Sequence, residues 1–311
     1  MNRRHPKIYR LLAFIGLIAT NQAQAQTQDP HRFDPPWNSP PKSAIEFTIQ
    51  GINNVPDLYG DIVDPQLVIF FAGNQFMCID ELLAGFKKKY PQIQRIFAET
   101  LPPGILAKQI EGGSLTIGNL RITHQPDVYT AGKQKMESMQ EHFSRTEPYA
   151  YNQLSLMVPE GNPKHITGLR DLQDKKIRVS MPNPAWEGIG RQIEAAYQKA
   201  GGEALHEAIM KTKVSDGSTQ LTRIHHRESP LRILLGNSDV APVWTSEVLY
   251  QKMIGHPVEE IEIPAEQNIR ATYVAGRLKN APRAEAADLF MDYLVSDDAK
   301  AIYKKYGFDV D

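Results

Sequence analysis

Cysteine is nearly absent from this sequence, because Cys78 is the only cysteine among 311 residues. A lone cysteine cannot form an internal disulfide, so hydrophobic cores must stabilise the fold even in an oxidising compartment. Cys78 flanks the apolar face of a predicted helix, and we interpret it as a small buried apolar group. The alternative is a soft-metal ligand or a thiol activated by the helix N-terminus.

A strong charge of either sign is also lacking, since 35 Lys and Arg residues stand against 36 Asp and Glu residues. Nucleic-acid binding requires a basic surface, so this composition argues against a nucleic-acid partner. Catalytic motifs are missing too, because the chain has no G-x-S-x-G elbow, no G-x-x-x-x-G-K-[ST] phosphate loop and no H-E-x-x-H zinc motif. We therefore predict a binding protein that is not an enzyme and needs no cofactor.

No apolar run is long enough to span a bilayer, but the first residues form a leader. Met1–Arg10 carries four basic residues and no acidic one, Leu11–Thr20 is apolar, and Ala23–Ala25 is an A-x-A pattern. This order is typical of a secretory signal peptide, so we predict one over residues 1–25 and a soluble periplasmic mature protein. An uncleaved membrane anchor is the alternative.

Residues 26–65 are rich in proline and polar residues, and we predict an N-terminal arm with little structure of its own. The pattern changes at Leu67–Phe71, an apolar run typical of a buried parallel strand. A helix to Tyr90, a strand over Ile93–Phe97 and a helix over Ile105–Glu111 follow. Alternating strands and helices predict an α/β fold with mainly parallel sheets flanked by helices.

The same alternation continues in the second half of the chain. We predict strands at Leu154–Val158, Ile177–Met181, Val240–Trp244 and Ala271–Gly276, and a helix over Gly188–Ala200 that Gly201 and Gly202 terminate. Two further helices, Ala281–Leu294 and Asp297–Tyr306, close the chain. The length after the leader is sufficient for two domains.

The segment L-P-P-G-I-L-A-K-Q-I-E-G-G, Leu101–Gly113, is a loop that turns into a helix. A helix N-terminus presents backbone N–H groups without intrahelical partners and a partial positive charge, which together favour an anion. The two prolines stiffen the loop before Gly104, where a side chain would block close backbone approach. We predict that this helix entrance faces a ligand.

Eight motifs occur in the order found in periplasmic molybdate-binding proteins, and together they resemble that family over residues 67–308. They are A-G-N-Q-F (Ala72–Phe76), P-P-G-I-L-A-K-Q-I-E-G-G (Pro102–Gly113), P-D-V-Y (Pro126–Tyr129), Y-N-Q-L-S-L-M-V-P-E-G-N-P (Tyr151–Pro163), L-R-D-L (Leu169–Leu172), R-V-S-M-P-N-P (Arg178–Pro184), H-H-R (His225–Arg227) and D-V-A-P-V-W-T-S-E (Asp239–Glu247).

The resemblance implies the two-lobed type II periplasmic binding protein fold, with the ligand in the cleft between the lobes. It implies a lobe 1 over residues 66–149 plus 268–311, a lobe 2 over residues 150–267, and crossovers near 149–152 and 264–272. It also implies a monomeric solute-binding protein that delivers a small ligand to an ABC permease. A membrane sensor is the alternative partner.

The pocket departs from the family where the molybdate binders place serines. Asn74 stands at the first turn and Pro102 and Pro103 at the second, while Trp244 matches the family tyrosine and Arg227 the family arginine. The alternative to a ligand-binding role is that Asn74 is an ordinary helix cap and that Glu99 is a solvated loop acid. The predicted ligand-binding residues are Asn74, Gln75, Glu99, Thr100, Gly104, Glu187, His225, His226, Arg227 and Trp244.

The ligand itself stays open at this point. The resemblance implies an oxyanion such as molybdate or tungstate. His225 and His226, with Glu187 and the missing serines, favour instead a divalent metal or a metal or metalloid species. Adjacent residues do not share one helix face, so two histidines on one ion require non-helical geometry. A carboxylate ligand is the third alternative.

Overall fold

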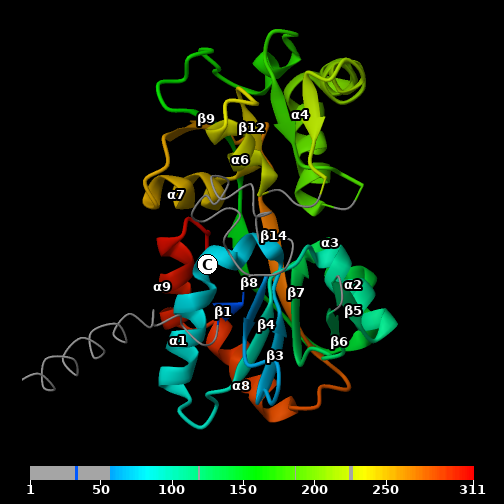
Figure 1. Ribbon diagram of the computed structural model, residues 1–311, viewed down its shortest axis with the longest axis vertical. Helices are drawn as coiled ribbons and strands as arrows, with labels where there is room; N and C mark the ends of the chain where they lie inside the picture. Colours follow the sequence, from blue (N-terminus) through cyan, green and yellow to red (C-terminus); the bar gives the residue numbers. More distant parts are fainter. Residues whose placement is uncertain (1–31, 34–56, 118–119, 186, 224–226) are drawn as a thin grey trace, which may run out of the picture.

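The computed structural model describes residues 32–33, 57–117, 120–185, 187–223 and 227–311. The predicted signal peptide and most of the predicted arm therefore lie outside the described residues, as do His225, His226 and Trp186. The described chain folds into two lobes that are stacked along the long axis of the molecule (Figure 1). Among the described residues, no helix has the length and apolar character needed to cross a membrane.

Lobe 1 is built on one seven-stranded sheet that contains both the first and the last strands of the described chain. Strands β3, β4 and β7 run parallel, whereas β2, β8 and β14 join their neighbours in antiparallel pairs. In sheet order the strands are β1 (Arg32–Phe33), β2 (Leu58–Gly60), β4 (Ile96–Glu99), β3 (Leu67–Phe70), β7 (Val128–Gly132), β14 (Ala271–Leu278) and β8 (Phe143–Asn152).

Two hydrophobic cores cover the two faces of this sheet. Figure 1 shows α1 and α9 on one side of lobe 1 and α2 and α3 on the other. The first core joins the sheet to α1 (Ile79–Lys89), α8 (Ala284–Leu294) and α9 (Asp297–Lys305). The second joins it to α2 (Pro103–Gly112), α3 (Lys133–Ser138) and the hairpin of β5 (Leu115–Ile117) and β6 (Leu120–Ile122), with a short 3-10 helix, η3 (Gln140–His142), before β8.

Helix α1 illustrates how the sequence determines the local structure. Ile79, Leu82, Leu83 and Phe86 recur at helical spacing and are buried in the first core. Acidic residues occupy the first turn and three lysines the last turn, which complements the helix dipole. The residues before it form a separate 3-10 helix, η2 (Gly73–Cys78), rather than a continuation of α1.

Lobe 2 contains a three-stranded sheet and a two-stranded sheet. The prediction of mainly parallel sheets is wrong for the lobe 1 sheet, in which only the pairs β3–β4 and β3–β7 of the described strands are parallel. It is also wrong for the first sheet of lobe 2, because β9 (Leu154–Pro159) pairs antiparallel with both β12 (Ala241–Trp244) and β13 (Val258–Glu262). Strand β9 enters directly from lobe 1, and β13 leads back towards it, so neighbouring strands run in opposite directions. The second sheet pairs β10 (Val179–Met181) with β11 (Thr219–Leu221) in parallel.

The helices of lobe 2 surround these sheets. The predicted stop at Gly201 and Gly202 is confirmed, since the range α4 (Gly188–Glu207) joins two helical parts across Gly202, whose φ of +68° and ψ of −164° are not helical. Glycine tolerates this positive φ, so the first helical part ends here and a second one follows. The remaining elements are η4 (Leu169–Gln173), η5 (Ala208–Thr212), α5 (Lys213–Ser215), α6 (Glu228–Leu234) and α7 (Thr245–Met253).

The N-terminal segment also differs from the predicted unstructured arm. Within the range 26–65, β1 and β2 are strands of the lobe 1 sheet. Leu58 of β2 is buried in the second core of lobe 1, which supplies the apolar contact that the composition of the arm did not indicate.

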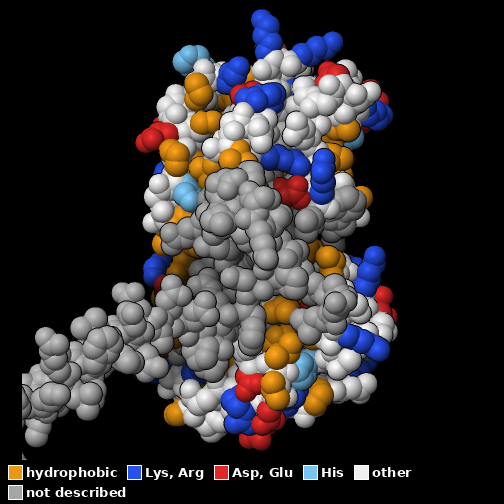
Figure 2. All heavy atoms as spheres, viewed as in Figure 1, with side chains coloured by type: hydrophobic (Ala, Val, Ile, Leu, Met, Phe, Trp, Pro, Cys, Tyr) orange, Lys and Arg blue, Asp and Glu red, His pale blue; other side chains and the backbone are white. Residues whose placement is uncertain are grey.

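The chain passes between the lobes twice, from β8 into β9 and from β13 into β14. Asn268 joins the two passages, because its side chain accepts a hydrogen bond from Leu154 N (3.0 Å) and donates one to Leu154 O (2.8 Å). On the visible face of the molecule, basic and acidic side chains of both lobes are interspersed, in keeping with the near-zero net charge (Figure 2).

Candidate functional site

A cavity of about 570 Å³ lies between the lobes. It falls within the range of volumes typical of small-molecule sites. Lobe 1, lobe 2 and the second passage between them all contribute to its walls, as expected for a ligand cleft. Its polar and charged lining residues are Asn74, Lys108, Glu111, Lys133, Gln134, Lys135, Glu187, Arg191, Gln192, Arg270, Thr272 and Tyr273.

The N-termini of two long helices reach this cavity from opposite lobes. Pro103 and Gly104 begin α2, and Gly188 and Ile189 begin α4, and all four residues line the cavity. Pro103 has no N–H, so Gly104 supplies the first donor of α2. Two helix N-termini that face one cavity give it a positive field from the backbone alone.

Cationic side chains reinforce that field. Five lysine and arginine residues line the cavity, against two carboxylates, Glu111 and Glu187. Arg191 of α4 is exposed and donates from Nη1 to Pro184 O over 2.7 Å, which holds its side chain beside the start of the helix. The site therefore favours a ligand of negative charge.

The floor of the cavity is aromatic and polar. Asn74 Nδ2 donates to the hydroxyl of Tyr273, and the Tyr273 ring lies edge-on to Trp244 with 6.2 Å between centroids. Burial raises the pKa of Tyr273 well above its usual range, so the hydroxyl stays protonated. The alternative interpretation of Asn74 as an ordinary helix cap is wrong, because its amide is held by the aromatic floor.

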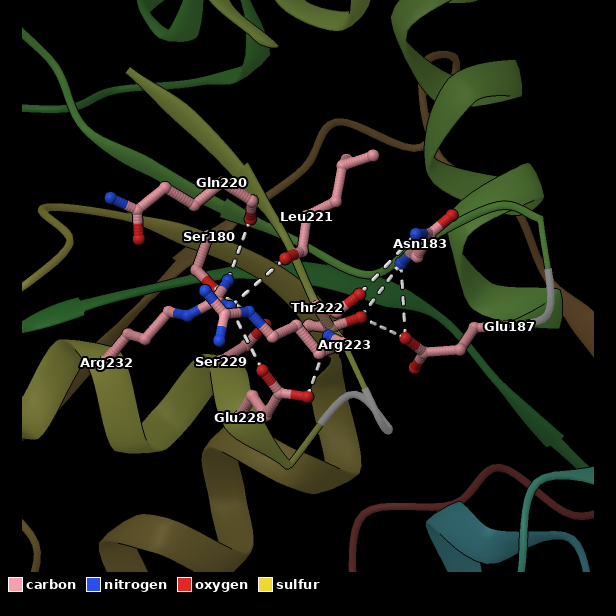
Figure 3. Close-up of polar contacts among 10 residues, drawn as sticks. All are labelled: Ser180, Asn183, Glu187, Gln220, Leu221, Thr222, Arg223, Glu228, Ser229 and Arg232. Atoms are coloured by element: carbon pink, nitrogen blue, oxygen red, sulfur yellow. Dashed lines mark hydrogen bonds and ion pairs between the residues drawn. The ribbon is translucent and has the colours of Figure 1, made fainter. Parts of the chain in front are cut away.

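The lobe 2 wall depends on a network of side-chain hydrogen bonds (Figure 3). Thr222 Oγ1 donates to Glu187 Oε1, and Asn183 N donates to the same carboxylate oxygen over 3.2 Å. Next to it, Arg232 donates to Leu221 O (3.1 Å) and to Glu228 Oε2 (3.0 Å). These hydrogen bonds fix Glu187 directly before α4, and Arg223 N donates to Glu228 Oε1 over 2.8 Å.

The structure brings four of the predicted site residues together at the cavity: Asn74, Gly104, Glu187 and Trp244. It places four others elsewhere. The side chain of Gln75 is buried in lobe 1, where Nε2 donates to the Tyr149 hydroxyl and Oε1 accepts from Tyr303. Thr100 is buried behind the loop, with its N–H donating to Asp57 O.

Glu99 is neither a ligand residue on the cavity wall nor a solvated loop acid. It ends β4 with 0% of its surface exposed, and Gln109 of α2 donates to its Oε1 over 2.9 Å. Among the described residues, its buried Oε2 has no hydrogen-bond partner. Desolvation raises the pKa of Glu99 to about 8, so this carboxyl is largely protonated at neutral pH. Its hydrogen bond with Gln109 fixes α2 to the end of β4.

Arg227 is also absent from the cavity wall. It lies at the N-terminal end of α6 and forms a buried ion pair with Asp57. His225 and His226 lie outside the described residues, so their predicted role as ligand or metal residues stays a prediction. In the described ranges, no group of three or more His, Cys, Asp and Glu residues could hold a metal ion.

Cys78 is fully buried, and its thiol donates to Gln75 O over 3.1 Å. Burial raises its pKa far above the usual range of a thiol, which disfavours the reactive thiolate. The interpretation of Cys78 as a small buried apolar group is confirmed.

Arg191, Arg270 and Tyr273 lie on the cavity wall but were not among the predicted site residues. Arg191 lies one turn into α4, directly after the predicted helix entrance, so its position carried a signal. Tyr273 follows the second predicted crossover, but an aromatic residue in a strand is by itself indistinguishable from core packing.

Comparisons with known proteins bear on the family and the fold of this chain. The model of the family described as bacterial extracellular solute-binding protein matches residues 67–309. A Bacillus subtilis (strain 168) protein named "Putative ABC transporter substrate-binding lipoprotein YvgL" is 26% identical over 162 residues, which cover 50% of this chain and 55% of that protein. The chain thus spans about half the length of that relative.

Two solved structures share the fold at low sequence identity. The periplasmic molybdate-binding protein of Azotobacter vinelandii is 17% identical, with a TM-score of 0.63 over 79% of this chain and 99% of that one. The periplasmic binding protein AfuA of Actinobacillus pleuropneumoniae, with bound fructose-6-phosphate, is 17% identical, with a TM-score of 0.63 over 80% of this chain and 85% of that one.

Proposed function

This chain belongs to the bacterial extracellular solute-binding protein family, and from that premise we propose that its interlobe cavity captures a small organic anion outside the cytoplasm. The observation that carries the proposal is the convergence of two helix N-termini and five cationic side chains on one cavity. Each feature alone is weak, but together they give an anion both hydrogen-bond donors and a favourable field.

The size of the cavity favours an anionic group attached to a larger body. A bare tetrahedral oxyanion fills only a small part of about 570 Å³. Trp244, Pro102 and Pro103 offer an apolar surface beside the helix N-termini, on which a carbon skeleton can pack. A phosphate ester such as a sugar phosphate, or a short hydroxy acid with a free carboxylate, fits this combination better than molybdate does.

The structural relatives bind both kinds of anion, since one is a molybdate-binding protein and another holds fructose-6-phosphate. The fold therefore supports either class, and the lining of this cavity favours the second. A divalent metal is the less favoured alternative, because the excess of cationic side chains repels a cation. His225 and His226 are the residues that would carry a metal site, in this cavity or elsewhere.

The partner that we propose is an ABC importer, as the name of the Bacillus subtilis relative indicates for that protein. The predicted signal peptide agrees with a periplasmic location. A membrane sensor that reads the ligand-bound state is the second candidate partner.

The test is calorimetric titration of the purified protein after extensive dialysis. The probes are molybdate, sulfate and inorganic phosphate, then fructose 6-phosphate, phosphoglycerate and citrate, and finally zinc and nickel. We expect at least one organic anion to bind more tightly than every bare oxyanion, and to stabilise the protein by about 2.7 kcal/mol at hundredfold excess over its Kd.

A pair of variants then locates the site. Arg191→Gln removes a cationic residue from the cavity wall and should weaken anion binding. Arg170→Gln is the matched control, because Arg170 is also exposed in lobe 2 and donates to a backbone oxygen, Ala200 O, at 2.8 Å. Binding by metals alone, or equal losses in the two variants, would contradict the proposal.

A further inference from the structure

A buried ion pair connects the two lobes beside the cavity. Arg227 Nη2 donates to Asp57 Oδ1, and the side chains are 3% and 1% exposed. The two residues are 170 positions apart in the sequence. Neither residue lines the cavity, so the pair is separate from the proposed anion site.

The two partners are anchored to different lobes. Asp57 leads into β2 of the lobe 1 sheet, and its carbonyl oxygen accepts from Thr100 N over 2.9 Å. Arg227 precedes α6, which packs on β9, β10 and β12 of lobe 2. Any movement that separates the lobes at this point must break the ion pair.

Two aromatic rings pack beside Arg227, one directly and one through the first. The Arg227 guanidinium lies 5.3 Å from the ring centroid of Phe76, which belongs to η2 of lobe 1. Tyr250 of α7 in lobe 2 meets the same ring edge-on, with 5.3 Å between centroids. Phe76 thus gives Arg227 a second favourable contact in lobe 1, and Tyr250 holds that ring from lobe 2. We call Asp57, Phe76, Arg227 and Tyr250 the latch.

We propose that the latch is a closure device, which holds the lobes together before any ligand is bound. In the closed state the two charges neutralise each other away from water. In an open state each charge is hydrated, so removing one partner penalises the closed state alone, because the other charge stays buried and loses this counter-charge. The latch therefore sets the ratio of closed to open molecules.

Two segments of lobe 1 connect the latch to the cavity: the segment that contains Phe76, and the segment that contains Thr100, whose N–H donates to Asp57 O. Phe76 is two residues beyond Asn74, and Thr100 is two residues before Pro102. The segments touch through their backbones, since a Cβ on Gly73 would lie 2.8 Å from Thr100 O. Closure at the latch thus fixes the lobe 1 wall of the cavity, and on the proposed function it raises ligand affinity.

The first measurement needs no ligand and is therefore independent of the proposed function. Spin labels at Lys88→Cys in lobe 1 and Lys175→Cys in lobe 2 report the distance between the lobes by double electron–electron resonance. Both positions are exposed, and the native Cys78 is buried and therefore protected from the label. We expect the ligand-free protein to show mainly one short distance.

Asp57→Asn should lower the ratio of closed to open molecules by about tenfold or more, because the guanidinium stays buried without its counter-charge. The double variant Asp57→Asn with Arg227→Gln removes both charges and should recover part of the loss. Asp292→Asn is the control, since the Arg145–Asp292 pair has a distance of 2.7 Å but lies within lobe 1.

A distance distribution of Asp57→Asn that equals that of the wild type would overturn the proposal. So would an equal change in Asp292→Asn. If Asp57→Asn does not fold, Tyr250→Ala tests the same device from lobe 2 and should also lengthen the distance. If the variants open but the protein binds none of the anions, the latch proposal stands and the proposed ligand class is rejected.

Discussion

The two walls of the cavity are built in different ways. At the start of α2, the lobe 1 wall presents backbone at Pro102, Pro103 and Gly104, and the buried Glu99 carboxyl holds this helix through Gln109. The lobe 2 wall is held by side chains, with Glu187 fixed through Thr222 and Asn183. A backbone wall recognises charge in a general way, whereas a side-chain wall can discriminate between ligands that share that charge.

The comparison predicts that lobe 1 substitutions act mainly on stability or on all anions alike. Lobe 2 substitutions at the side-chain network should change the preference among anions. The following experiments test this division.

The largest expected effect concerns the acid beneath the lobe 1 wall. The folded-state pKa of Glu99 is raised to about 8 by burial, above its value in the unfolded chain. The folded state thus keeps a proton that the unfolded state loses, so this contribution to stability is complete below about pH 4.5 and is lost as pH rises to about 8.

Glu99→Gln should remove this loss, with a gain on the order of 4 kcal/mol in unfolding free energy at pH 8 relative to pH 4.5. Urea denaturation across that pH range measures it. Glu160→Gln, at an exposed site of lobe 2, is the control. Parallel pH profiles of wild type and Glu99→Gln would contradict a raised pKa.

The next effect concerns the start of α4, where the lobe 2 wall also depends on close backbone packing. A Cβ on Gly190 would lie 2.6 Å from Pro182 O and from Pro184 N. These backbone atoms cannot move aside as a flexible side chain does, so Gly190→Ala should destabilise the protein by about 2 kcal/mol. Thermal unfolding measures the loss.

Gly188→Ala is the matched control for this substitution. Gly188 lies two residues earlier in the same helix, and a Cβ there would meet only Arg191 Nη2 at 3.8 Å. Its melting temperature should stay close to that of the wild type. Equal destabilisation of the two variants would contradict backbone crowding at Gly190 as the cause, since alanine has the higher helix propensity at both positions.

A third experiment addresses the backbone of the lobe 1 wall. Gly104→Val places a branched side chain at the first N–H donor of α2, which blocks the approach of a ligand. We expect affinity to fall about tenfold for every anion that binds, which is about 1.4 kcal/mol, with little change in melting temperature. A change in the order of ligand preference would mean that lobe 1 also discriminates.

The smallest effect is expected at the side-chain network of lobe 2. Thr222→Val keeps the shape of the side chain but removes the hydroxyl that donates to Glu187. The lost hydrogen bond should cost about 1 kcal/mol of stability. Calorimetry should then show a changed ranking of the anions, and an unchanged ranking would break the proposed division between the walls.

Much of the fold could be predicted from local patterns. Strand β3 was expected over Leu67–Phe71 and spans Leu67–Phe70, since a short, continuous apolar run between turn residues has few alternatives. The helix expected over Gly188–Ala200 ends as predicted at the glycine pair, where Gly202 has non-helical backbone angles. The second helical part of α4 was not predicted, because the burial of Leu205 in the lobe 2 core is a tertiary contact.

The site residues that lie at helix starts could be predicted from the sequence. The residues whose side chains are placed by tertiary contacts could not. Asn74, Gly104 and Glu187 lie at the starts of helical segments, which the sequence marks. Gln75 and Glu99 are their neighbours in the chain, but their side chains point into lobe 1. Arg227 matched a family arginine, yet its partner Asp57 comes from the segment predicted to have little structure.

Strand β14 lies inside the lobe 1 sheet, between β7 and β8, although it is made after all of lobe 2. A growing chain therefore completes lobe 2 while the lobe 1 sheet still has a gap in its middle. Helices α8 and α9, which cover one face of that sheet, come later still. Lobe 2 can thus fold early from a continuous segment. Lobe 1 must instead keep apolar strands exposed until β14 and the helices after it have been synthesised. During that interval the exposed strands of lobe 1 can bind chaperones or aggregate.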